Sequence, residues 1–192
     1  MFRFSHSIFT IALLLYSHSS YAHNEELIQE AREIVKQFAG RLKPALKSAI
    51  QSGGLTHAVE VCAVEAPKIS ESLSVDTGWQ VRRVSLKPRN SRTAIADNFE
   101  RSVLLDFEQQ QAQGAIANDL HHAEQVDGEF RYMQAQGVEP VCLNCHGEHV
   151  QEPVHDRLKR FYPDDLARGY ALGQIRGAIS LKKTLKPKSE GK

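Results

Sequence analysis

The chain has 192 residues, of which 41% are apolar, and its 24 Lys and Arg residues nearly balance 23 Asp and Glu residues. This length and apolar content predict one globular domain with a substantial core, and they exclude a disordered chain or a disulfide-stapled miniprotein. The near-zero net charge argues against a protein that binds nucleic acid or anionic lipid through phosphate contacts. The three cysteines cannot all pair within one chain, so at least one of them has another role.

Residues 1–22 have the pattern of a signal peptide. Arg3 is their only charged residue, an apolar run follows over residues 8–16, and Ser20 and Ala22 give the small-x-small sequence of a cleavage site. The run is too short to cross a bilayer core of about 30 Å as a helix. We expect cleavage after Ala22 and export to the periplasm, an oxidising compartment, with no integral membrane segment left in the mature chain. An uncleaved N-terminal anchor is the alternative.

Two helices are predicted next. Between residues 24 and 50 apolar residues recur at steps of three and four, with Asn24 as the candidate cap. Pro44 is expected to kink or divide this helix, and Gly53 and Gly54 are expected to end it. A second stripe over residues 55–73 predicts another helix, with Cys62 on its apolar face.

The remaining residues predict a small sheet with helices around it. We expect a strand over residues 79–85, a helix over 99–107 that ends near Gly114, and a hairpin of strands 119–126 and 129–136 joined by an Asp-Gly turn. A last core strand is expected over residues 175–181, before a solvated, flexible basic tail at 182–192. The predicted fold class is α+β, a small and mostly antiparallel sheet flanked by helices, in one domain over residues 23–181.

Cys142, Cys145 and His146 form a C-x-x-C-H sequence, the attachment signature of c-type haem. Two thiols at this spacing can each add to one of the two vinyl groups on the same porphyrin edge, and the adjacent histidine can then bind the iron. The predicted signal peptide strengthens this interpretation, because covalent haem attachment takes place on the exported side of the membrane. The sequence therefore predicts one covalent haem c.

Two other interpretations of these residues need no haem. A disulfide between Cys142 and Cys145 would be structural or would serve a thiol oxidoreductase, but a thioredoxin-like site places C-x-x-C at a helix N-terminus after an early strand. Here the motif comes late, in a segment with little periodicity. Cys62, Cys142, Cys145 and a histidine would instead suit a Cys3His zinc site, because thiolate and imidazole are the ligands that zinc prefers.

Cys62 is the one cysteine that would form no thioether bond to the haem. It is either a buried free thiol that packs as a small hydrophobe or a thiolate ligand opposite His146, since iron accepts Cys as well as Met or His in that position. The residues alone leave both roles open. Other candidate ligands, each individually weaker, are His57, His121, His122, His149, His155 and Met133.

The chain resembles the Tll-like c-type haem domains, a family of small exported monohaem proteins with a PAS-like fold. The resemblance covers most of the exported chain and rests on blocks at residues 58–62, 66–67, 78–83, 87–90, 131–133, 142–147, 162–163, 169–170 and 175–178. It implies a PAS-like sheet wrapped by helices, thioether links at Cys142 and Cys145, and axial iron ligation by His146 and Cys62.

These features together predict a carrier or sensor rather than a catalyst. Two protein ligands would leave the iron six-coordinate, which favours electron transfer or redox sensing with a protein partner, and a thiolate ligand would lower the reduction potential. A gas sensor, in which a diatomic molecule displaces Cys62, and a haem peroxidase are the alternatives. Candidates for pairing with the haem propionates, from local charge alone, are Arg82, Arg83, Lys87 and Arg89, with a solvated loop as the alternative.

Overall fold

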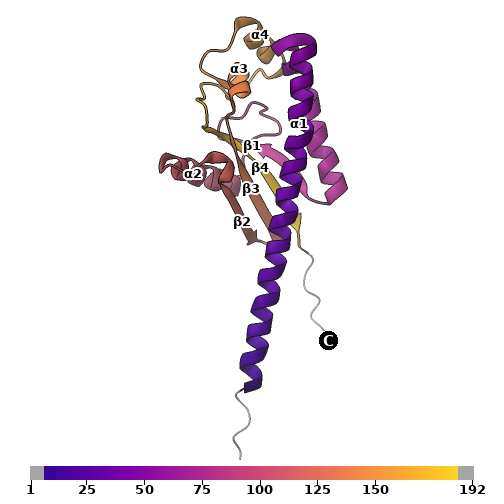
Figure 1. The fold of residues 1–192 in the computed structure, drawn as a ribbon, viewed down its shortest axis with the longest axis vertical. Coiled ribbons are helices and arrows are strands. Elements are labelled where there is room, and N and C mark those ends of the chain that lie inside the picture. Colours follow the sequence, from indigo (N-terminus) through magenta and orange to yellow (C-terminus); the bar gives the residue numbers. More distant parts are fainter. Residues whose placement is uncertain (1–6, 186–192) are drawn as a thin grey trace, which may run out of the picture.

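The computed structural model describes residues 7–185 and, within them, the side chains of residues 23–185. Residues 1–6 of the predicted signal peptide and residues 186–192 of the predicted tail lie outside the described residues. The main elements are α1 (Ser7–Thr77), β1 (Gln80–Val84), α2 (Asn98–Ala112), β2 (His121–Val126), β3 (Glu129–Gly137), α3 (Leu143–His146), α4 (Glu152–Phe161) and β4 (Ile175–Thr184) (Figure 1).

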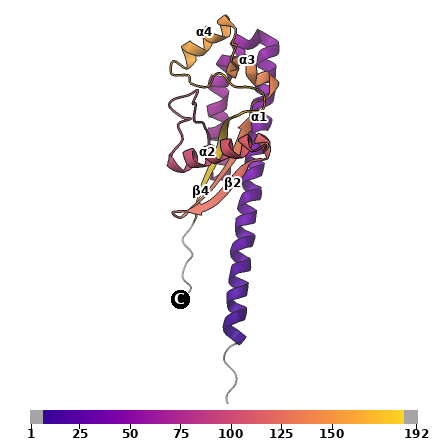
Figure 2. The same ribbon diagram turned by 90° about the vertical axis from the view of Figure 1, so that its left-hand side faces the viewer.

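The four strands form one antiparallel sheet in the order β1-β4-β3-β2. Helix α1 covers one face of this sheet and α2 covers the other (Figures 1 and 2). The core on the α1 face is built from Leu27, Ala31, Ile34, Phe38, Ile69, Leu73, Trp79, Val81, Phe130, Tyr132, Ile179 and Leu181. The core on the α2 face is built from Val84, Val103, Leu104, Phe107, Ala117, Met133, Ala135, Ile175 and Ala178. The predicted α+β class and antiparallel sheet are confirmed.

Helix α1 consists of two halves that fold back on each other. The break lies at Gly54, whose φ of 72° and ψ of −171° are not helical, and Figure 1 shows the second half running back beside the first. Arg41 in the first half donates a hydrogen bond to Ser72 in the second over 3.1 Å. The predicted break at Gly53 and Gly54 is therefore confirmed, because glycine adopts a positive φ without steric cost.

The first half of α1 differs from the expectation in two details. Pro44 does not divide the helix, since Gly54 is the residue at which the helical φ and ψ fail. The hydrogen bond that proline removes is offset by packing, because Phe38 and Ala49 on either side are buried. Asn24 does not cap the helix, because the helical backbone extends upstream to Ser7.

Among the residues that the structure describes, none of the helices has the length and apolar content that a membrane span requires.

The predicted hairpin and the predicted helix before it are confirmed. Asp127 and Gly128 both have positive φ, 51° and 75°, as a type I′ turn between two strands requires. Strand β2 begins at His121 and not at residue 119, because residues 117–119 form a 3-10 turn. Helix α2 begins with a capping box in which the side chains of Asp97 and Glu100 each accept a hydrogen bond from the other's backbone N–H.

Two elements near the C-terminus differ from the prediction. Helix α4 was not expected, because its apolar stripe consists of only Val154 and Leu158, both buried against Val59 of α1. Strand β4 continues to Thr184, so the predicted tail starts three residues too early. Lys182 and Lys183, which were assigned to the tail, lie in the strand and form ion pairs of 3.2 Å with Glu129 and 2.8 Å with Glu30, respectively.

Candidate functional site

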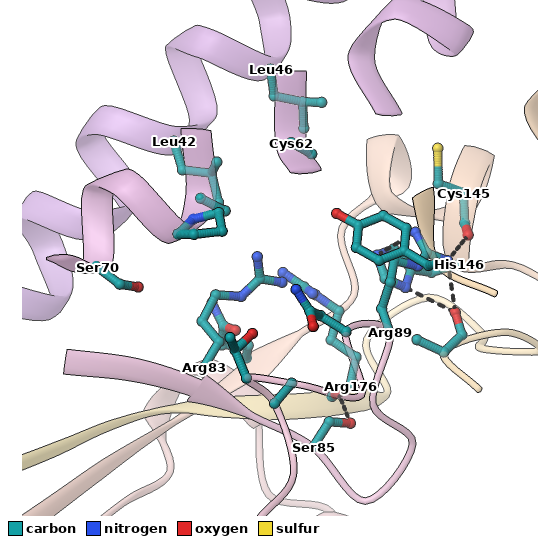
Figure 3. A pocket seen from close by; sticks show the side chains of 18 of the residues that line it. Leu42, Leu46, Cys62, Ser70, Arg83, Ser85, Arg89, Cys145, His146 and Arg176 are labelled. Carbon is teal, nitrogen blue, oxygen red and sulfur yellow. Dashed lines mark hydrogen bonds between the residues drawn. The ribbon is translucent and has the colours of Figure 1, made fainter. Parts of the chain in front are cut away.

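A cavity of about 520 Å³ lies between α1, strands β1 and β4, and the segment that contains α3 (Figure 3). This volume falls within the range of roughly 300–1,000 Å³ that is typical of sites for small molecules and cofactors. The α1 wall is mainly apolar and is made by Leu42, Leu46, Ile50, Leu55, Ala58, Val59, Cys62 and Ala66. The opposite wall and the floor carry polar and basic side chains, so the cavity suits a ligand that is largely apolar but charged at one end.

All four residues predicted to hold haem line this one cavity: Cys62, Cys142, Cys145 and His146. Cys62 comes from the second half of α1, whereas Cys145 and His146 come from α3 on another wall (Figure 3). The three cysteines are free thiols. Cys142 ends a 3-10 turn and directly precedes α3, so the motif itself is locally helical, which was not expected, within a segment that has little other regular structure. The fold thus brings together residues that are far apart in the sequence.

The thiols of Cys62 and Cys145 are not poised for nucleophilic chemistry. Burial raises the pKa of the Cys62 thiol, although the nearby charge of Arg83 acts in the opposite direction. Burial likewise raises the pKa of Cys145, against the effect of Arg89. A reactive thiol requires a lowered pKa, so the environment of Cys145 does not favour it as the attacking thiolate of a thiol oxidoreductase.

A zinc site is not assembled either. Within the part of the chain whose side chains are described, no three His, Cys, Asp or Glu residues are grouped closely enough to bind a metal ion. Cys145 packs against Val59 and the core of α4, whereas Cys142 packs against the separate cluster around Tyr170. The two thiols therefore face different surroundings and, with Cys62, do not surround one point.

His146 is held in a single neutral tautomer by two contacts. Its Nδ1 lies 3.0 Å from the carbonyl oxygen of Ala167, and its Nε2 lies 3.3 Å from Nη1 of Arg89. Because a guanidinium can only donate, Nε2 is the acceptor and Nδ1–H donates to Ala167. Burial, reinforced by the positive charge of Arg89, holds the pKa of His146 well below its usual range. The lone pair on Nε2, which here accepts from Nη1 of Arg89, is the one on His146 that a metal could bind.

Arg89 is fixed by a buried carboxylate that was not predicted. Its Nε donates to Asp165 over 3.2 Å, and the Asp165 side chain has no exposed surface. The Arg89 guanidinium also donates to the backbone carbonyls of Cys145 and Ala167. Arg89 and Asp165 therefore tie the loop after β1 to α3 and orient His146. No pattern in the sequence pairs these two residues, because only the fold brings them together.

Arg83 of β1 and Arg176 of β4 rise from the sheet into the cavity (Figure 3). The Nε atoms of both are buried without a hydrogen-bond partner among the described residues. Burial, together with the like charge of Arg176, lowers the pKa of Arg83 to about 9. Arg176 was not among the predicted basic candidates. Arg82 was among those candidates, but its guanidinium lies 3.8 Å from the carboxylate of Glu100 and donates a hydrogen bond to the carbonyl of Ile95.

Arg176 reaches the cavity because β4 is irregular at Gly177. Regular alternation would place Arg176 on the same side as Ala178 and Ser180, which pack toward α2. Gly177 has a φ of 149°, and the pairing of β3 with β4 shifts register beside it. This break in the pleat accounts for the presence of Arg176 beside Arg83.

Replacing Gly177 with alanine should destabilise the protein strongly. A Cβ at this position would lie 2.3 Å from the backbone oxygen of Val84, which cannot move without breaking the sheet. We expect urea denaturation to report a loss of about 2 kcal/mol or more. Gly114→Ala is the matched control, because Gly114 also has a positive φ, 100°, but has no atom within 4 Å of the added Cβ. Equal losses in both variants would contradict the steric explanation.

The other predicted ligand candidates lie away from the cavity and do not line it: His57, His121, His122, His149, His155 and Met133. Met133 is fully buried in the core on the α2 face. His121 stacks on Tyr132 and contacts Arg32, while His122 lies 3.3 Å from Glu124. Cys62 is therefore the candidate second ligand that the fold places near His146.

Comparison with known proteins agrees with this fold. The model of the Tll0287-like family matches residues 17–183. The chain belongs to the Tll0287-like family. Among solved structures it is similar to the crystal structure of the cyanobacterial heme-protein Tll0287, with a TM-score of 0.66 and 22% sequence identity. The match covers 85% of this chain and 98% of that one, so the two share the whole domain fold. No curated protein sequence matches the chain significantly.

Proposed function

We propose that this member of the Tll0287-like family is an exported c-type haem protein with one haem. Cys142 and Cys145 would carry the haem through thioether bonds, and His146 and Cys62 would be its two axial iron ligands. The observation that carries the proposal is that Cys62 lines the same cavity as the distant C-x-x-C-H motif. Membership of the family and the similarity to a cyanobacterial heme-protein support it.

The residues around the cavity fit a haem in three respects. The apolar α1 wall suits the faces of a porphyrin, and the neutral His146 tautomer offers Nε2 to a metal. Arg83 and Arg176, whose buried Nε atoms have no hydrogen-bond partner among the described residues, suit its acidic edge. When bound, haem supplies a one-electron iron couple. The chain itself positions the ligands, keeps water from the apolar side and holds the Nδ1 proton of His146 on the Ala167 carbonyl.

Electron transfer or redox sensing is the activity that this ligand set supports best. Two protein side chains would fill both axial positions, so the iron would change oxidation state without binding a substrate. The thiolate of Cys62 would donate charge to the iron and stabilise its ferric form, which predicts a low reduction potential. A redox or signalling protein would be the partner.

A pyridine haemochrome spectrum tests haem attachment directly. Protein from a host competent in cytochrome c maturation should show haem c that stays with the chain in a denaturing gel. The double variant Cys142→Ser, Cys145→Ser should lose all covalent haem, while Cys62→Ala should keep it, because Cys62 forms no thioether in the proposed protein. Wild-type protein without haem, or covalent haem in the double variant, would refute the proposal.

Carbon monoxide distinguishes an electron carrier from a ligand sensor. We expect the Soret band of the reduced protein to stay unchanged when carbon monoxide is added, because both axial positions are filled by protein side chains. Cys62→Ala opens one position and should bind the gas, which makes this variant the positive control. A shifted Soret band in the wild type would favour the gas-sensor alternative.

Export with removal of residues 1–22 is compatible with the fold. Leu27 is the first buried residue of α1 among those whose side chains are described, so cleavage after Ala22 would remove none of the described core. We expect protein recovered from the periplasm to begin at His23 when its intact mass is measured. A mass that includes residues 1–22 would favour the uncleaved anchor.

A further inference from the structure

Two arginines face the cavity without a counterion. Arg83 and Arg176 come from neighbouring strands, near the register pair Val84 and Ala178, and both line the cavity. The nearby buried carboxylates are committed elsewhere: Asp165 pairs with Arg89 and Arg168, and Glu100 pairs with Arg82 and Arg131 behind the sheet. Glu71 also lines the cavity, but its side chain is exposed. Within residues 23–185, the two arginines thus have buried Nε atoms and no ion pair with an acidic side chain.

Buried charges without partners are costly, so this arrangement indicates a ligand. An unpaired buried ion is strongly destabilising unless an opposite charge satisfies it. The mutual repulsion of the two guanidiniums adds to this cost. An arginine fork matches a carboxylate in shape and can donate two parallel hydrogen bonds to it. Two adjacent forks in a cavity with one mainly apolar wall therefore suit a flat apolar ligand with two carboxylates on one edge.

The geometry points to Arg83 and Arg176 as the binding site for the two propionate groups of the haem, an inference that rests on the proposed function. Haem carries both propionates on one edge, so two basic side chains that lie beside each other in the cavity can each bind one of them. Arg89 is a less suitable partner, because Asp165 and two backbone carbonyls already occupy its guanidinium.

The irregularity at Gly177 supports this assignment independently. It turns Arg176 away from the α2 side that regular alternation would give it and toward the cavity that Arg83 lines. A strand break that brings a second cation beside the first is unfavourable by itself, because like charges repel. It is explained if the pair together binds two negative charges.

The test uses the haem-loaded protein and its variants Arg83→Gln and Arg176→Gln. A pyridine haemochrome spectrum first establishes that each sample carries haem. Resonance Raman spectra then follow the propionate bending bands, which should shift in both variants because each loses a hydrogen-bonding fork. The midpoint potential is measured from pH 5 to 9. Each variant should show an apparent propionate pKa raised by about one unit or more, since an adjacent cation favours the carboxylate.

Matched substitutions separate this role from general effects of charge or folding. Arg82→Gln removes a neighbouring arginine that also lines the cavity but whose guanidinium contacts Glu100 and the carbonyl of Ile95, so it should change neither readout. Arg83→Lys keeps the charge but loses the fork, so the potential should stay near that of the wild type while the Raman bands still shift. The other titratable groups that face Arg83 are Cys62, Tyr162 and Arg89, and all are retained in these variants.

The outcomes distinguish this inference from the proposed function. If the glutamine variants carry haem but their Raman bands and pH profiles match those of the wild type, the propionates bind elsewhere and the inference is wrong. If the glutamine variants do not retain haem, Arg83→Lys decides, because unchanged Raman bands in that variant would also overturn the inference. Wild-type protein without haem would refute the proposed function itself and the propionate site with it.

Discussion

Cys62→Ala is expected to change the visible spectrum of the haem-loaded protein and to raise its reduction potential by on the order of 100 mV. The proposed thiolate stabilises ferric iron by donating negative charge, so its removal favours the ferrous form. The covalent links at Cys142 and Cys145 would remain, which keeps the haem in place for the measurement. Potentiometric titration with optical detection gives the potential and the ligation change in one experiment.

A neighbouring residue provides the control for Cys62. Val64 lies two positions further along α1, and its side chain is 47% exposed. Val64→Ala should therefore leave the spectrum and the potential as in the wild type. A Cys62→Ala protein that carries haem with an unaltered spectrum would show that Cys62 is only a buried thiol.

Asp165→Asn is expected to cost about 3 kcal/mol of unfolding free energy, because it leaves the Arg89 guanidinium charged and unpaired inside the protein. Arg89 is 15% exposed and Asp165 is fully buried, so solvent screens this pair little. The loss should appear as a lower midpoint in urea denaturation. Asp165 also accepts the backbone N–H of Ala167 over 2.9 Å, so its replacement loosens the carbonyl that orients His146.

The adjacent aspartate isolates the effect of burial. Asp164 is exposed and accepts a hydrogen bond from Ser91 over 3.1 Å. Asp164→Asn removes the same charge at a solvated position and should cost less than about 0.5 kcal/mol. If both variants lose the same stability, the Arg89–Asp165 pair is not the connection between the loop after β1 and α3 that we describe.

Much of the fold could be predicted because it rests on local patterns. The stripe of Leu27, Ala31, Ile34 and Phe38 fixes the buried side of α1, and the Asp127-Gly128 turn fixes the hairpin. Helix α4 could not be predicted in this way, since its two buried residues become a pattern only against Val59. The end of β4 was misjudged because its lysines look solvated in sequence, whereas strand pairing and ion pairs with Glu30 and Glu129 hold them.

The candidate site could likewise be predicted only where its residues are contiguous in the sequence. The C-x-x-C-H motif is contiguous, and its chemistry can be read without a fold. The sequence left the role of Cys62 open until the structure placed it on the same cavity as His146. Asp165 and Arg176 gave no local signal, because their importance comes from contacts across the tertiary structure and, for Arg176, from a strand irregularity.

The strand order sets when during folding the cavity can exist. β4 is the last strand along the chain, yet it pairs with both β1 and β3 and so joins the two parts of the sheet. A chain that lacks this strand has no connection between β1 and the hairpin and no Arg176 in the cavity floor. Contacts as distant as Lys183 with Glu30 must form at this stage, and such long-range closure slows folding. The C-terminal strand is therefore the closing step of assembly, and a truncation before residue 175 would leave the motif without its pocket.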